Sequence, residues 1–165
     1  MNHSSVISAE MKSIREDIMN FEFDIKNMDG SFVGDSDACP LKHSFSDGIY
    51  VREIFIPAGM FIVGKIHKHD HPNFLMSGTV DVVTESGSER IVGPCAMISS
   101  AGTKRALHAI TDLVWITVHS NPTNTQDLNK LEQIVIADSY EAYDKFLAQK
   151  ERKTLFSKLL KLIGK

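Results

Sequence analysis

From Gly48 to Ser120 the sequence consists of short β-branched and aromatic runs separated by glycine and proline turns. Runs such as Ile49–Pro57 and Met60–His67 are about as long as one strand, and Pro57-Ala58-Gly59 between them suits a turn. No stretch among them is long enough for the helix that joins two parallel strands. About seven or eight short strands at this spacing therefore predict an antiparallel sheet that is closed or sandwiched.

Helical patterns flank this β region. Before it, apolar residues recur at three- and four-residue spacing from Met11 to Ile25, with Ser8 as a candidate cap, and residues 29–48 have the composition of a loop. After it, the pattern predicts a short helix over 127–134, a second helix from Ser139 and a last, basic amphipathic helix. The chain thus divides into a helix and loop (1–47), a β-barrel (48–120) and C-terminal helices with a basic tail (121–165).

The charge distribution limits the classes of partner. The net charge is −3, but residues 150–165 carry +5 and the rest of the chain carries −8. An acidic body disfavours a nucleic-acid binder, and the short basic tail is not expected to anchor in a membrane. The tail is expected to pack on the barrel or on another subunit, with a partner protein's groove and an anionic membrane as alternatives.

The two cysteines and the N-terminus point to a reduced, cytoplasmic protein. Cys39 and Cys95 have neither metal-ligand spacing nor the density of a disulfide framework, so both are expected to be inert thiols. The first residues lack a basic region followed by an apolar one, and no apolar run reaches the length of a membrane span.

Three of the seven histidines alternate within five residues, at His67, His69 and His71. Imidazole is the commonest metal ligand in proteins and titrates near neutral pH. This stretch is therefore the strongest chemical signal in the chain. It is compatible with a metal site, a ligand pocket or a solvated loop.

A family resemblance is carried by four segments: Tyr50–Gly59, Ile66–Lys68, Ala101–Arg105 and Val114–His119. They resemble cupins, and more narrowly small cupin-like proteins encoded by tailed bacteriophages, and the similarity extends roughly from Gly48 to Leu131. The resemblance implies an all-β core with helical ends: a single cupin, that is a jelly-roll-like antiparallel β-barrel, with an N-terminal helix and C-terminal helices.

The cupin motifs assign positions to the histidines. Aligned at Gly78, the first motif, G-x5-H-x-H-x3,4-E-x6-G, places His71 at its glutamate, His67 at its second histidine and Lys65 at its first. His69 then falls in the loop between strands. The second motif, aligned at Gly102, places Arg105 at its histidine. Only His67 and His71 remain as metal ligands by this alignment.

Two cations beside two histidines would weaken the binding of a divalent metal and attract an anion. The resemblance therefore implies an anion pocket of Lys65, His67, His71 and Arg105. Trp115 or Thr117 would add a stacking face or a hydroxyl, and His119 shares their parity along the strand. A purely structural role is the alternative for two of these residues: Arg105 would pair with a carboxylate such as Glu53 or Asp81, and Trp115 would belong to the core. His108 has the opposite parity to Arg105 and is expected to point outward.

Three functions follow as hypotheses. In the first, the chain binds a small anion, such as a nucleotide, without turnover, and serves as a phage-encoded sponge for host nucleotide signals. In the second, it is a metal-dependent oxygenase, isomerase or lyase that uses His67 and His71 with His69 and His119, and its cofactor is a divalent transition metal. In the third, it is a virion structural protein. A homo-oligomer is expected, and the sequence assigns no catalytic residue.

Overall fold

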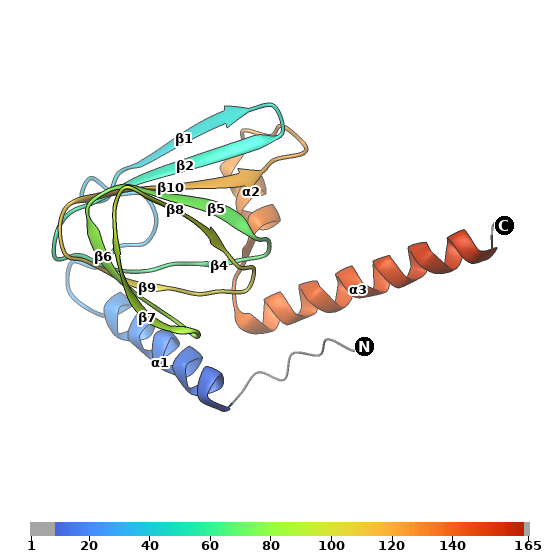
Figure 1. Cartoon of the computed structure of the whole chain (residues 1–165), viewed down its shortest axis with the longest axis horizontal. Coiled ribbons are helices and arrows are strands. Elements are labelled where there is room, and N and C mark those ends of the chain that lie inside the picture. Colours follow the sequence, from blue (N-terminus) through green and yellow to red (C-terminus); the bar gives the residue numbers. More distant parts are fainter. Residues whose placement is uncertain (1–8, 164–165) are drawn as a thin grey trace.

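The structure is a computed structural model that describes residues 9–163 (Figure 1). The candidate cap Ser8 and the end of the basic tail, Gly164 and Lys165, lie outside the described residues. The elements are α1 (Ala9–Lys26), β1 (Leu41–Ser46), β2 (Ile49–Ile56), β3 (Phe61–Val63), β4 (Ile66–His67), β5 (His71–Ser77), β6 (Thr79–Thr84), β7 (Gly87–Val92), β8 (Cys95–Ser99), β9 (Ala106–Ala109), β10 (Leu113–Ser120), α2 (Leu128–Val135), β11 (Ile136–Ala137) and α3 (Tyr140–Ile163).

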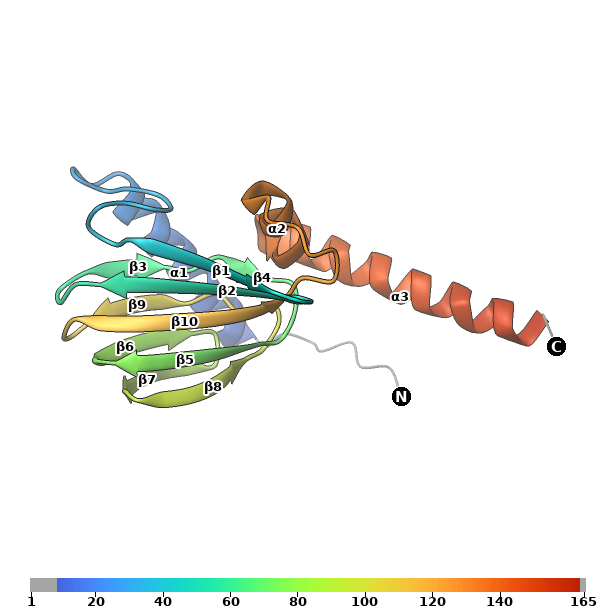
Figure 2. The ribbon, with the colours of Figure 1, turned by 90° about the horizontal axis from the view of Figure 1, so that it is seen from above.

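Two antiparallel sheets form a jelly-roll-like sandwich (Figure 2). One has the order β1-β2-β10-β5-β8 and the other β3-β9-β6-β7, while β11 pairs separately with β4. Within the described chain the sheets do not close into a barrel, so that part of the prediction is wrong. One physical reason lies between β7 and β8, where Pro94 has no N–H to continue a ladder and the chain moves from one sheet to the other.

The core follows from the alternation of side chains along the strands. In β10, Leu113 and Trp115 are buried while Val114 and Ile116 face outward, as the two-residue period requires. Residues with the same inward parity on both sheets form one cluster together with a cysteine from the loop before β1, and this cluster closes one end of the sandwich interior with apolar side chains. Its buried members are Cys39, Ile56, Leu75, Val80, Val82, Ile91, Ala109, Leu113 and Trp115.

Helix α1 covers the outer face of the four-stranded sheet (Figure 1). Its Ile18 is buried there, as the predicted apolar spacing requires. Two ion pairs hold the helix in place: Arg15 with Glu85, and the buried Lys104 with Glu22 at 3.0 Å. The loop predicted over 29–48 is interrupted by strand β1, so the sheet begins earlier than the sequence suggested.

The C-terminal part differs from its predicted form. In place of two helices after Ser139 there is one helix, α3, and none of its residues is buried. Its first turns lie beside the sheets, and the rest leads away from the body (Figures 1 and 2). Leu155, Phe156 and Leu162 are largely exposed, so the expected packing of the tail on its own β core is not observed. No helix within residues 9–163 is long and apolar enough to cross a membrane.

Candidate functional site

Three neighbouring strands become polar at the same end. Antiparallel pairing sets Leu113 of β10 against Ile56 of β2, then Trp115 against Ile54, Thr117 against Arg52 and His119 against Tyr50. On the other side of β10, β5 changes from Leu75 through Asn73 to His71 with the same inward parity. The interior therefore has an apolar floor, a middle layer with an arginine, and a layer of histidines at its mouth.

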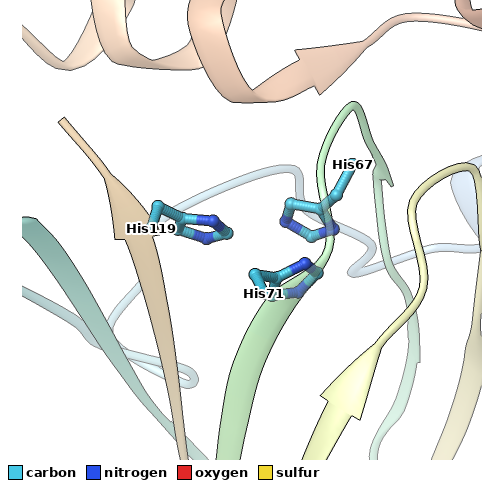
Figure 3. Close-up of side chains that lie close together, drawn as sticks. All are labelled: His67, His71 and His119. Carbon is cyan, nitrogen blue, oxygen red and sulfur yellow. The ribbon is translucent and has the colours of Figure 1, made fainter. Parts of the chain in front are cut away.

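The mouth brings together His67, His71 and His119, from β4, β5 and β10 (Figure 3). One nitrogen of each ring lies within 4.8 Å of a nitrogen of the other two. The ring centroids are 4.1 Å apart for His67 and His71, 5.0 Å for His67 and His119, and 4.8 Å for His71 and His119. Three imidazoles at this separation can bind one metal ion together.

Burial keeps these histidines uncharged. It is the main reason that the pKa of His67 is lowered to about 2 and that of His119 to about 3. The neighbouring histidines and Arg52 disfavour the cationic forms further. The pKa of His71 is lowered by the same burial. At neutral pH all three rings therefore offer a lone pair, as metal coordination requires.

The tautomer of His71 leaves its other nitrogen free. Its Nδ1 lies 3.1 Å from the carbonyl oxygen of His69. Because a carbonyl oxygen only accepts, Nδ1 carries the proton, and Nε2 is left with its lone pair. That Nε2 is buried and has no hydrogen-bond partner. A backbone carbonyl that orients a histidine while the opposite nitrogen is free is the usual arrangement at metal sites.

Below the histidines lie two guanidinium groups, those of Arg52 and Arg105. Arg105 donates to the hydroxyl of Ser99, and its Cζ lies 5.9 Å from the centre of the Trp115 ring. The Nε of Arg52 is buried without a hydrogen-bond partner. Burial lowers the pKa of both groups, but both remain cationic.

All six residues predicted to bind the ligand line one small cavity of about 80 Å³. These residues are Lys65, His67, His71, Arg105, Trp115 and Thr117. Their arrangement differs in two respects from the expectation. The ammonium group of Lys65 is partly exposed and pairs with Glu132 of α2. Trp115 belongs to the core, and its Nε1 donates to Asn73 Oδ1 at 2.9 Å.

The alternative partners proposed for Arg105 are wrong for the described chain. Asp81 binds Arg90 on β7, and Glu53 faces outward on β2. His69 lies in the loop outside the three-histidine group, as the register predicted, and its ring packs edge-to-face with Phe146 at a centroid distance of 5.4 Å. His108 lies on the outer face of its sheet, stacked on Phe61, as its parity predicted.

The sequence reasoning gave too little weight to His119 and missed Arg52, Asn73 and Ser99. His119 entered only as a possible addition to a metal site, although its parity with Trp115 and Thr117 was noted. For Arg52 the available signal was its position two residues before Ile54 and four before Ile56, on the inward face of a strand. A cation that replaces an apolar residue in such a run marks a polar interior.

The C-terminal segment forms one wall of the mouth. Strand β11 pairs with β4 so that Ile136 lies opposite His67. Gly102 donates its N–H to the carbonyl of His67 at 2.8 Å, and Tyr143 of α3 lies directly over Gly102. The helical end that lay outside the family resemblance therefore fixes the position of a site histidine.

A larger groove of about 480 Å³ lies between α1 and the four-stranded sheet. Its lining is mainly apolar, with residues such as Ile14, Phe21 and Val83, and the carboxylate of Asp81 beside it is already bound by Arg90. The three-histidine group found within residues 9–163 lies elsewhere. The smaller cavity is therefore the candidate site.

Comparison of the sequence with protein-family models and with curated proteins gives no match. Similar solved structures include ectoine synthase from P. lautus, with 13% identity and a TM-score of 0.49 over 66% of this chain and 83% of that chain. KdgF from Halomonas sp. has 15% identity and a TM-score of 0.47 over 62% and 95%. The Cnp3 cupin domain of Schizosaccharomyces pombe has 15% identity and a TM-score of 0.46 over 62% and 76%. These likenesses concern the fold alone.

Proposed function

We propose that this protein is a metal-binding cupin whose three histidines hold a divalent transition metal beside a small anionic ligand. One observation carries the proposal. His67, His71 and His119 lie on three different strands, yet each offers an uncharged nitrogen within 4.8 Å of the other two. Three imidazoles suit zinc, iron, copper or nickel better than calcium or magnesium, which prefer oxygen ligands.

The residues present fit such an ion. His71 is oriented by a backbone carbonyl, and its buried Nε2 lacks a partner that a metal would supply. The two arginines oppose a bare divalent cation, but an anion bound between them and the metal would offset that repulsion. His119 thus supplies a third metal ligand, whereas the hypothesis of an anion pocket counted only His67 and His71 as ligands.

The finer parts of the first hypothesis receive unequal support. Binding of a small anion is supported by Arg52 and Arg105, which face the cavity. A nucleotide is several times larger than a cavity of about 80 Å³ would hold, so the geometry favours a smaller ligand. The phage-encoded sponge and the virion component stay predictions from the family resemblance.

A metal-dependent enzyme is the second candidate function. Three protein ligands leave at least one coordination position open, which is typical of catalytic rather than structural metal sites. The cavity beneath the histidines would place a small ligand beside that position. Such a metal would supply Lewis-acid or redox chemistry, while the arginines of this chain would bind and orient the anion.

Metal content tests the proposal. Protein purified without a histidine tag and incubated separately with zinc, iron, manganese and nickel is measured by elemental analysis and native mass spectrometry. We expect about one ion per chain, lost from His67→Ala and His119→Ala variants because each removes one of three ligands. His69→Ala and His108→Ala are the controls and should retain the ion. Less than about one-tenth equivalent of every metal in the wild type would overturn the proposal.

A further inference from the structure

The feature that the proposed metal does not explain is a cavity with two cations and no counter-ion. Arg52 projects inward from β2, and Arg105 enters the same space just before β9. Among the described residues, no carboxylate oxygen lies within 4.0 Å of either guanidinium group. Both side chains are only partly exposed, and a guanidinium group withdrawn from water without a carboxylate partner carries a desolvation cost that a bound anion would offset.

The nearby acidic side chains are engaged elsewhere. Glu132 acts on Arg52 from a distance, but its carboxylate binds Lys65 at the surface. Glu85 binds Arg15 of α1, and Glu89 lies on the exposed strand β7. The three histidines are uncharged at neutral pH and supply no negative charge. The anion that would balance the two arginines must therefore come from outside the described chain.

A hydroxyl in the same cavity also lacks an acceptor. The Oγ of Ser99 accepts hydrogen bonds from Asn73 Nδ2 and from Arg105 Nη2. Two accepted bonds occupy both of its lone pairs, so its own proton is free for donation to a third group. Asn73 does not take it, because this side chain presents its Nδ2 to Ser99 and its Oδ1 to Trp115. Apart from the lone pairs of the histidines, which the proposed metal would use, the cavity presents donors that an oxyanion would complement.

The size and the floor of the cavity restrict that anion further. The cavity of about 80 Å³ is much smaller than the roughly 300–1,000 Å³ of ordinary ligand pockets, so it suits a ligand of only a few non-hydrogen atoms. The floor below the arginines is apolar and consists of side chains such as Ile54, Ile56 and Leu107. Phosphate is charged on all sides and leaves this floor uncovered, whereas a short carboxylic acid covers it with its hydrocarbon end.

We propose that the ligand of this cavity is a short-chain carboxylate of a few carbon atoms, with its carboxylate bound by Arg52 and Arg105. The inference rests on the proposed function in placing this ligand beside the three histidines. The arginine contacts do not themselves require a metal. Arg52 acts here as the specificity-determining residue, because its Nε is buried and no protein group satisfies it.

Calorimetry on the full chain tests this ligand class. The probes are pyruvate, propionate, the uncharged isostere propionamide and inorganic phosphate, with the metal content of every sample measured in parallel. Pyruvate and propionate should bind to the wild type, whereas propionamide should not. The Arg52→Met variant should weaken pyruvate binding at least about tenfold, because it removes charge-assisted hydrogen bonds. Arg90→Met, at the exposed pair with Asp81, should leave it unchanged.

The outcomes separate this inference from the proposed metal site. A wild type that holds metal but binds none of the four probes would overturn the carboxylate assignment and leave the metal proposal intact. If a wild type without metal bound pyruvate and this binding depended on Arg52, the carboxylate assignment would be supported and the metal proposal would be overturned. Tight phosphate binding without propionate binding would replace the carboxylate by an inorganic oxyanion. Equal binding of propionate and propionamide by the wild type would overturn the role of charge, even if the variant failed to fold.

Discussion

The histidines at the mouth make the stability of the metal-free protein depend on pH. An exposed histidine in the unfolded chain has a pKa near 6.5, whereas the folded values are about 2 for His67 and about 3 for His119. The unfolded state therefore binds more protons than the folded state below pH 6.5. Stability is fully present above that pH and is lost as the pH falls towards the folded values.

We expect a His119→Gln variant to lose less stability on acidification than the wild type. Each uncharged buried histidine contributes up to about 1.4 kcal/mol per pH unit to the slope below pH 6.5, so the difference between pH 6.5 and 5.0 should be roughly 1–2 kcal/mol. Urea unfolding of metal-free protein at several pH values measures it. His108→Gln, on the outer face, is the control. If the free energy of unfolding fell equally with pH in the wild type and in His119→Gln, His119 would not be held in its uncharged form by the fold.

At the level of single residues, the sequence predicted the members of the cavity better than their roles. The register from Gly78 placed His67 and His71 correctly inside and His69 outside. It could not supply His119, because this residue lies about fifty positions away and joins the others only through the pairing of β5 with β10. Nor could it show that Lys65 turns to Glu132, since that partner belongs to a helix outside the resemblance.

Among the elements, the junction between α3 and the loop after β8 has a specific steric requirement. Gly102 has φ +82°, and a Cβ there would lie 2.5 Å from Cε1 of Tyr143. We expect Gly102→Ala to destabilise the fold by about 1–3 kcal/mol, because the backbone strain is joined by a displacement of the Tyr143 ring. Urea unfolding measures the loss. Since Gly102 also binds the carbonyl of His67, metal affinity should fall as well.

Gly59 provides a matched control for this prediction. It has the same φ of +82°, but a Cβ there meets no atom within 4 Å. Gly59→Ala should therefore show the backbone strain alone, about 1 kcal/mol, and leave metal affinity unchanged. Equal losses in the two variants would mean that the contact with Tyr143 contributes nothing to stability.

Most strands were predictable because the two-residue alternation is strong wherever one face is buried. Strand β1 was missed because it is an edge strand, paired only with β2, and its outward residues Lys42, Ser44 and Ser46 resemble those of a loop. Helix α3 was divided in two because its apolar residues lie on no common buried face. Hydrophobic periodicity in a sequence arises where one face of an element is buried. A helix that projects from the body has no such face, so its sequence shows little of this periodicity.

Considered as a whole, the molecule leaves one large apolar surface uncovered. The outward residues of the three central strands β2, β10 and β5 are almost entirely apolar, with Glu53 as the only charged one. Phe55, Phe74 and Met76 are 36–51% exposed on this face, which we call the outer sheet face. Glu53 lies level with Lys42 of the edge strand, so its charge is at the border of the patch.

The dimensions of the outer sheet face suit a second copy of the chain. With the edge strands β1 and β8 included, five strands about 4.8 Å apart and roughly 20 Å long cover about 500 Å² in projection. Protruding aromatic side chains raise the accessible area towards the approximately 800 Å² per partner of a standard interface. A flat sheet can pack on a symmetry-related copy of itself, since both surfaces are then identical and apolar. We therefore propose a homodimer formed through this face.

Light scattering during size-exclusion chromatography tests the dimer. The wild type should have twice the 18.4 kDa mass of one chain, and a Phe74→Glu, Met76→Glu variant should be a monomer, because both charges would be buried at the interface. Val92→Glu, at an exposed position of β7, should remain dimeric. A chain that ends at Gln149 lacks the projecting part of α3 and should also remain dimeric. If that truncation alone produced monomers, the interface would lie on α3 and not on the sheet.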